Sequence, residues 1–112
     1  MPRSSNDKNP RRYILHGIWP ETTLMPGAPL SAHCGLLLAR NLDQFLTTRE
    51  LSLRDVSSRA GIAHSTVARV LTGDVLPDIG TLIRLEDALS HQLWPGPHAV
   101  RAAVQRAEHA DQ

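Results

Sequence analysis

Cysteine is scarce in this chain, which has Cys34 and no other, so an intrachain disulfide is excluded. The neighbouring His33 and Cys34 do not have the spacing of zinc ligands, and no second cysteine stands at such a spacing. We therefore expect no metal, no cofactor and a reduced, intracellular protein.

Long apolar runs are also missing. No stretch approaches the roughly 18 apolar residues that a membrane-spanning helix needs. The opening segment MPRSSNDKNPRR lacks the apolar core of a signal peptide. We expect a cytoplasmic protein that makes no contact with a membrane.

The residue patterns of common catalytic sites are absent. The chain has no glycine-rich phosphate loop, no nucleophile beside a base in a known motif and no cluster of carboxylates. We predict that the protein is not an enzyme.

Neither sign of charge is in large excess, since the formal net charge is only +1. Residues 31–94 carry six arginines against seven acidic residues, a sum of −1, and residues 1–30 carry four basic residues against two acidic ones, a sum of +2. A polyanion is therefore not held by bulk charge; it needs a few well-placed side chains and two copies of the chain.

The length of 112 residues suits one compact domain. Proline and glycine cluster toward the ends, so we expect a basic arm with an apolar extension over 1–30, an ordered core over 31–94 and an Ala-rich tail over 95–112. Residues 13–30 have two interpretations: a short strand or a segment laid across the core, which either covers this domain or contacts a second copy.

What is present is helical periodicity. Apolar positions predict helices over 32–48, 53–60 and 64–72, and over a fourth segment that Asp78 caps and that stops near His91. Ser52 and Asp55 form a capping-box pattern at the second helix, and Gly61 ends it. The fold class is therefore an all-α domain of four to five helices with an N-terminal extension and a short C-terminal tail.

The sequence also gives expectations for the two tryptophans and the tail. Trp94 is expected to fill the core at the end of the fourth helix, with Trp19 either its packing partner or part of a dimer surface. The tail can be helical, but its apolar face is thin, which suggests a frayed or partner-dependent segment.

The third helix is too short to be stable alone. Val56 and Ala60 on the second helix can pack against Ile62, Val67 and Val70 across a sharp turn and so bury one side of the third helix. Its other side then faces outward, with small side chains that allow close approach and polar ones that can hydrogen-bond to base edges.

The stretch SLRDVSSRAGIAHSTVARVLTG, residues 52–73, resembles the helix-turn-helix of bacterial and phage regulators. With a helix before it and PDIGTLIRLEDALSHQLWP after it, residues 34–94 are similar to the XRE family, the lambda-repressor-like domains of Cro and phage repressors. GIAHSTVARVLTG is also close to the lactose-repressor type, whose sugar-binding domain is not seen here.

The resemblance implies a role for particular residues. His64, Ser65 and Arg69 match positions that read base edges, and Ala63 and Ala68 match positions that border the bases. Phosphate contacts are implied for four further residues: Ser52, Arg54, Thr66 and Thr72. Arg69 as a plain surface residue, and His64 at the edge of the interface, are the simpler alternatives.

Two features depart from the family pattern. Ala63 stands where a capping Ser or Thr is common, which removes about 1 kcal/mol of capping. Asp74 and Asp78 lie in a loop that approaches the DNA backbone in this family, and their charge repels phosphate. The basic residues of the N-terminal arm are a substitute or only a solubilising tail: Arg3, Lys8, Arg11 and Arg12.

These observations predict sequence-specific binding of double-stranded DNA by a homodimeric transcriptional regulator, more specifically a repressor, with the third helix in the major groove. The alternative is a protein-interaction module, such as an antitoxin-like partner-binding protein, for which DNA binding is secondary. An architectural or recombination-directing DNA-binding protein fits the same residues.

Overall fold

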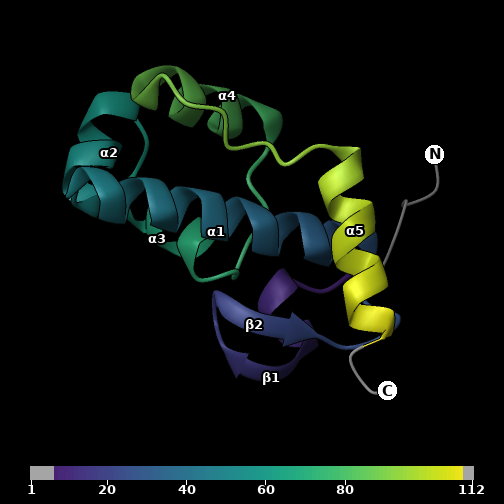
Figure 1. Ribbon diagram of the computed structural model, residues 1–112. Coiled ribbons are helices and arrows are strands. Elements are labelled where there is room, and N and C mark those ends of the chain that lie inside the picture. Colours follow the sequence, from purple (N-terminus) through teal and green to yellow (C-terminus); the bar gives the residue numbers. More distant parts are fainter. Residues whose placement is uncertain (1–6, 110–112) are drawn as a thin grey trace, which may run out of the picture.

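The computed structural model describes residues 7–109. One long helix crosses the middle of the molecule, and the other elements pack around it (Figure 1). In chain order the elements are η1 (Pro10–Tyr13), β1 (Ile14–Ile18), β2 (Glu21–Leu24), α1 (Leu30–Arg49), α2 (Leu53–Ala60), α3 (His64–Leu71), α4 (Ile79–Leu89) and α5 (Pro97–Glu108).

The main core lies between α1 and the three helices that follow it. α1 contributes Leu38, Leu42 and Phe45, and the shorter helices close over these side chains. The other buried members of this cluster are Leu46, Val56, Val67, Val70, Leu85, Leu89 and Leu93. Burial of this apolar surface is the main favourable contribution to folding, and it holds against α1 three helices that are each too short to be stable alone: α2, α3 and α4.

The helices α2 and α3 form the predicted helix-turn-helix, with the bounds close to those expected. Ser52 Oγ accepts a hydrogen bond from the Asp55 amide at 3.1 Å, and Asp55 Oδ2 accepts one from the Ser52 amide at 2.9 Å. Gly61 follows α2 with φ of 65°, a left-handed conformation that costs glycine no steric strain. The capping box and the glycine end are therefore confirmed.

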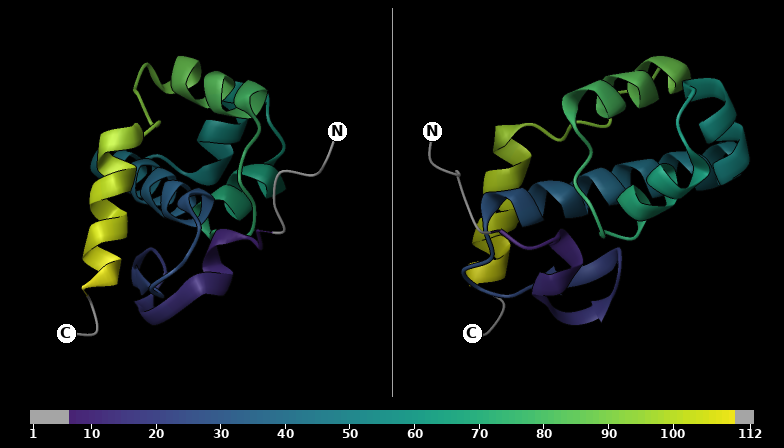
Figure 2. Two further views of the ribbon diagram at one scale, coloured as in Figure 1. Left: turned by 90° about the vertical axis from the view of Figure 1, so that its right-hand side faces the viewer. Right: turned by 180° about the vertical axis from the view of Figure 1, so that it is seen from behind.

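The expectation of an all-α fold is wrong in one respect. β1 and β2 pair as an antiparallel hairpin, from Ile14 opposite Leu24 to Ile18 opposite Glu21. The hairpin lies below α1 (Figure 1), and Figure 2 shows it from two further sides. Of the two interpretations of residues 13–30, the strand is correct, and a second small core formed by Leu24, Ala32 and Leu36 attaches it to α1.

The C-terminal segment, expected as a frayed or partner-dependent tail, contains the helix α5. α5 stands against the N-terminal half of α1 (Figure 1), and Val100, Ala103 and Ala107 are buried on it. Small side chains at this spacing let two helices approach closely, so the thin apolar face is sufficient when α1 supplies the other surface.

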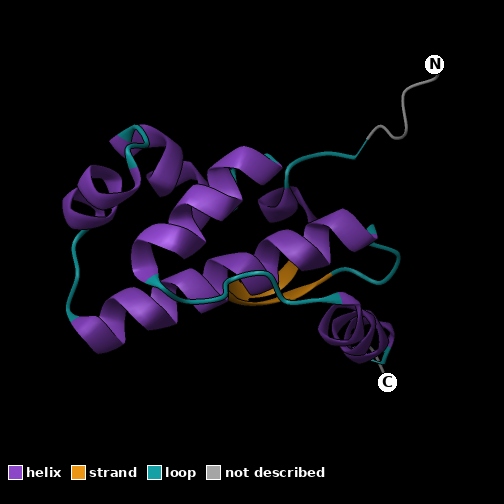
Figure 3. Ribbon diagram, turned by 90° about the horizontal axis from the view of Figure 1, so that it is seen from above, coloured by secondary structure: helices purple, strands orange, loops and turns teal. Residues whose placement is uncertain are grey.

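The prediction that Trp94 fills the core is wrong, because Leu93 occupies that place. Leu93 is 1% exposed, whereas Trp94 is 46% exposed. The Glu86 carboxylate accepts hydrogen bonds from the amides of Leu93 and Trp94, at 2.7 and 2.8 Å, and Asn41 donates to the Leu93 carbonyl at 2.8 Å. These bonds fix the linker between α4 and α5, which runs over α1 when seen from above (Figure 3).

Candidate nucleic-acid interface

The outward side of α3 is a strip of polar and small side chains. Successive residues of a helix are rotated by about 100°, so positions 64, 65, 68 and 69 fall within one arc of the helix. His64, Ser65 and Arg69 are exposed on this arc, while Val67 and Val70 are buried on the opposite side. The structure therefore brings together the residues that the sequence analysis assigned to base reading.

The two alanines of the predicted site have small side chains, which allow another molecule to approach this surface closely. Ala63 is exposed at the N-cap of α3, and Ala68 is partly buried between the exposed positions. Among the described residues, the side chains of His64, Ser65 and Arg69 have no hydrogen-bond or ion-pair partner. Their donors and acceptors are thus free for a ligand.

The start of α3 lacks side-chain capping. Ala63 makes no side-chain hydrogen bond, as expected, although its carbonyl accepts from the amides of Thr66 and Val67, at 3.0 and 3.3 Å. Thr66 is partly buried at the edge of the exposed arc. The helix therefore depends on packing and on its other end for stability.

The N-terminus of α2 presents the second group of candidate contacts. Ser52 and Arg54 are exposed there. The Ser52 oxygen accepts from the Asp55 amide, so this side chain is already part of the helix cap. Hydrogen bonds from the Ser52 amide and hydroxyl group lower the pKa of Asp55, so a carboxylate charge lies close to any phosphate bound at this point.

Thr72 is in a less suitable position for a phosphate contact. Its hydroxyl lies 3.1 Å from Asp74 Oδ2 and 3.3 Å from the Arg69 carbonyl oxygen, so its single proton already has acceptors. A phosphate at this hydroxyl would also lie near the Asp74 carboxylate.

Asp74 and Asp78, the two acids after α3, each have a structural role. Arg11 Nη1 lies 3.4 Å from Asp74 Oδ1, an ion pair that offsets the negative charge. Asp78 Oδ1 accepts from the Thr81 amide at 2.7 Å and caps α4 as expected, and this hydrogen bond lowers the pKa of Asp78. Of the basic arm, Lys8 and Arg12 are exposed, and Arg3 lies outside the described residues.

The N-terminal hairpin holds the end of α3, which the sequence analysis missed. Trp19 Nε1 donates to the Leu71 carbonyl at 2.8 Å, and the Arg11 amide donates to the Gly73 carbonyl at 3.0 Å. A Cβ atom at Gly73 would lie 2.4 Å from the Trp19 ring, so only glycine permits this contact. The sequence held two signals for this contact. Trp19 lies in an apolar extension next to a basic arm, and Gly73 lies in an acidic loop.

The match to known families agrees with this geometry. Residues 42–90, from the middle of α1 to the end of α4, match the family described as Helix-turn-helix, which is the XRE-family domain. This part of the chain is therefore similar to the helix-turn-helix domains of the XRE family. The family is a DNA-binding regulatory family and not an enzyme family, so the match supports DNA binding by a helix-turn-helix regulator.

Searches of curated proteins and of solved structures gave no match to this chain. The hairpin and α5 lie outside the matched residues. In the described part of the chain, no helix has both the length and the apolar character to cross a membrane.

Proposed function

We propose that the chain is a sequence-specific regulator of transcription, a repressor, which places α3 in the major groove of duplex DNA. The observation that carries this proposal is the outward arc of α3, where His64, Ser65 and Arg69 are exposed and have no partner among the described residues. Arginine donates two hydrogen bonds to a guanine edge, and the hydroxyl of serine both donates and accepts.

The phosphate contacts in this proposal come from Ser52, Arg54 and Thr66. Ser52 and Arg54 stand at the start of α2, where free backbone amides and the helix dipole favour an anion. We rank Thr72 below these three because its hydroxyl already faces Asp74.

Useful specificity requires two copies of the domain, because one helix-turn-helix reads few base pairs. A two-fold dimer places its half-sites about one helical turn, roughly 34 Å, apart. Because such a regulator must reach the DNA that it binds, we expect it to be cytoplasmic.

The test is selection from a random duplex library at about 150 mM salt, followed by competition titration on the best site. We expect a two-fold-related motif that binds at least roughly a thousandfold more tightly than random duplex. Weak binding that ignores sequence and falls steeply with salt would contradict base reading by α3.

Two variants show whether the outward arc of α3 reads the motif. The test variant, Ser65→Ala combined with Arg69→Ala, should abolish enrichment of the motif. Arg101→Ala, which removes an exposed arginine from α5, should leave enrichment unchanged.

A further inference from the structure

A hollow of about 420 Å³ lies between α1, α4 and α5. Leu30, Cys34 and Leu38 line it from α1, at a spacing of four residues that places them on one face of that helix. Leu82 lines it from α4 and Val100 from α5. Its volume falls in the range of about 300–1,000 Å³ that is typical of small-molecule sites.

The lining of this hollow is apolar and uncharged. None of the described residues that border it carries a charge. Pro77 and Pro97 are part of the wall, and proline has no amide proton to donate. The hydroxyl of Ser31 donates to the Asp7 carboxylate at 2.6 Å, so this polar group already has a partner and a negative charge lies next to it. A charged ligand would find no opposite charge in the lining, and an anion would be repelled by Asp7.

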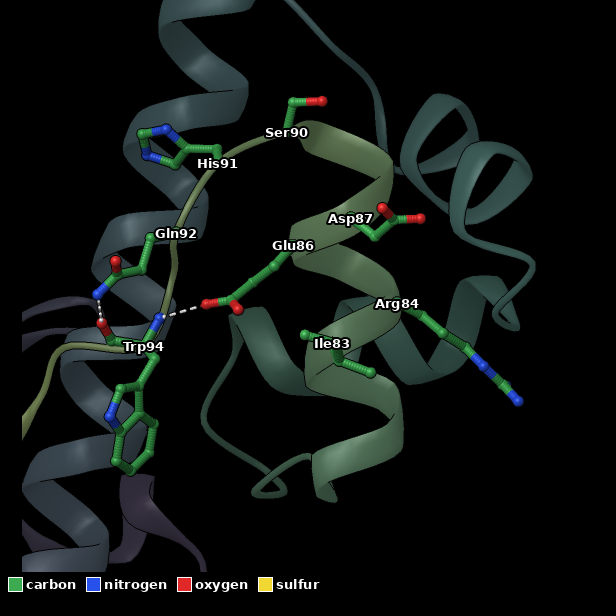
Figure 4. Close-up of a pocket in the computed structure, with 8 residues that line it drawn as sticks. All are labelled: Ile83, Arg84, Glu86, Asp87, Ser90, His91, Gln92 and Trp94. Carbon is green, nitrogen blue, oxygen red and sulfur yellow. Dashed lines mark hydrogen bonds between the residues drawn. The ribbon is translucent and has the colours of Figure 1, made fainter.

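A second hollow, which also borders Trp94, has a different lining. It measures about 790 Å³, and its border carries the charged side chains of Arg84, Glu86 and Asp87 (Figure 4). The Arg84 and Asp87 side chains are directed away from Trp94 (Figure 4). The apolar character is therefore a property of the hollow between α1, α4 and α5, and not of the whole surface around Trp94.

The walls of the apolar hollow are held by contacts of their own. The Glu86 carboxylate accepts hydrogen bonds from the amides of Leu93 and Trp94 and so fixes the linker; Figure 4 shows the bond to Trp94. A Cβ atom at Gly35 would lie 3.0 Å from Leu76 Cδ2, so α1 and the segment before α4 approach closely at that point. Because these contacts do not depend on an occupant, the hollow is already formed in the free protein.

This hollow is separate from the candidate nucleic-acid interface. None of the residues assigned above to base or phosphate contact borders it. Leu30, Cys34, Leu38 and Val100 also lie outside residues 42–90, the part of the chain that matches the helix-turn-helix family. An inference about the hollow therefore rests neither on the proposed function nor on the family match.

We propose that the hollow between α1, α4 and α5 is a binding site for a small, neutral, apolar molecule, aromatic or aliphatic. The uncharged lining selects a neutral ligand. The size selects a small one, because a stable protein interface buries about 800 Å² on each partner, which the walls of this hollow do not supply. A molecule of this class touches all three helices at once.

The first test is an NMR titration of the full chain with 1-naphthalenemethanol, a neutral two-ring probe. We expect saturable shifts of the amide signals of Cys34, Leu82 and Val100, with one probe per chain and a Kd of about 1 mM or tighter. The matched anion, 1-naphthoate, has the same rings and a carboxylate. It should bind at least about tenfold more weakly, because its charge has no partner in the lining.

The second test uses Cys34, the only cysteine of the chain, as a reporter of the hollow. Iodoacetamide, which is neutral, alkylates its thiol. At a probe concentration of about five times the Kd, about one chain in six is unoccupied, so the alkylation rate should fall about sixfold.

Two variants change the hollow in different ways. Cys34→Met fills part of it with a flexible apolar side chain and should weaken binding of 1-naphthalenemethanol at least about fivefold. Leu30→Asp replaces a half-exposed apolar residue of the lining with a charge, and should weaken binding at least about tenfold. Aspartate is favourable in the first turn of a helix, so the second variant should fold even if the first does not.

Ile18→Asp is the control, since Ile18 is 85% exposed on the hairpin and does not border the hollow. It should bind the probe as wild type does. Circular dichroism shows which variants are folded.

Four results would overturn this site. They are no saturable shifts up to about 5 mM probe, 1-naphthoate binding as tight as that of the alcohol, an affinity that the folded hollow variants leave unchanged, or an equal loss in Ile18→Asp. Alkylation of Cys34 that slows as the protein concentration rises, without probe, would show that a second copy covers the hollow and would overturn it as well. Failure of the DNA selection with intact probe binding contradicts only the proposed function.

Discussion

The indole nitrogen of Trp19 donates a hydrogen bond of 2.8 Å to the carbonyl oxygen of Leu71, the last residue of α3. The same ring covers Gly73 closely enough to exclude a side chain at that position. α3 has no side-chain cap at its start, so the hairpin fixes the end of a helix that is weakly held at the other. A segment outside the helix-turn-helix therefore positions the candidate recognition helix.

Trp19→Phe should lower the free energy of unfolding by about 1–3 kcal/mol, because the ring still packs but the Leu71 carbonyl loses its donor. Urea denaturation measures this change. Affinity for the selected DNA site should fall as well, since the end of α3 is then less well fixed.

Trp94→Phe is the control for this substitution. Among the described residues the indole nitrogen of Trp94 has no acceptor, and the side chain is half exposed. Equal losses of stability in the two variants would show that the hydrogen bond to Leu71 contributes nothing of its own.

The helix-turn-helix could be predicted because its signals are local. The capping box of Ser52 and Asp55, the left-handed Gly61 and the spacing of Val67 and Val70 each act within one or two turns of the chain. Such signals can be read without knowing the rest of the fold, and the outward arc of α3 follows from them directly.

The hairpin, α5 and the place of Trp94 could not be predicted because each depends on distant partners. The hairpin is held by the Arg40 guanidinium, which donates to the carbonyls of Pro20 and Thr22 at 2.8 Å each. Leu93 in place of Trp94 depends on Asn41 and on Glu86. A shift of one residue in the linker exchanges the buried and exposed side chains, and periodicity does not determine that shift.

The N-cap of α2 gives a prediction that separates stability from DNA binding. Ser52→Ala should lower the free energy of unfolding by about 1 kcal/mol, because the Asp55 amide loses its acceptor. The pKa of Asp55 should rise toward its usual range in this variant, since a hydroxyl that lowers it is removed. Denaturation and NMR titration of the carboxylate measure the two effects.

Ser52→Asp is the matched variant. Aspartate is as good an N-cap as serine, so Ser52→Asp should keep about the wild-type free energy of unfolding, but its charge repels a phosphate and should lower the affinity for DNA. Wild-type DNA affinity in Ser52→Asp would mean that no phosphate lies at the start of α2.

His33 on α1 should make stability depend on pH. Burial lowers its pKa below the usual range, with Arg106 acting in the same direction and Glu108 opposing both. The unfolded chain then binds a proton more readily than the folded one. Stability from this group is therefore complete above the unfolded pKa of about 6.5 and is lost as the pH falls below it.

Urea denaturation at about pH 7.5 and pH 5.5 measures this loss. The chain has six histidines, so the useful quantity is the difference between wild type and His33→Gln at the two pH values. Glu108→Gln removes the opposing carboxylate and should make the loss larger. If His33→Gln loses as much stability on acidification as wild type, His33 is not the group responsible.

Arg69→Ala is the sharpest test of base reading by α3. Arg69 is exposed in the last turn of the helix and has no ion-pair partner in the described part of the chain. Loss of a bidentate hydrogen bond to one base should cost about 1–3 kcal/mol of binding free energy and relax the sequence preference at a single base pair. Competition titration with single-base variants of the selected site measures both.

Arg54→Ala should behave differently, although it also removes one exposed positive charge. A lost phosphate contact weakens binding to all duplexes about equally and reduces the slope of log affinity against log salt by about 1. If Arg69→Ala gives this uniform pattern, Arg69 contacts the backbone and not a base. Unchanged affinity and preference in Arg69→Ala would remove this residue from the interface, leaving His64 and Ser65 as the candidate base-reading side chains of α3.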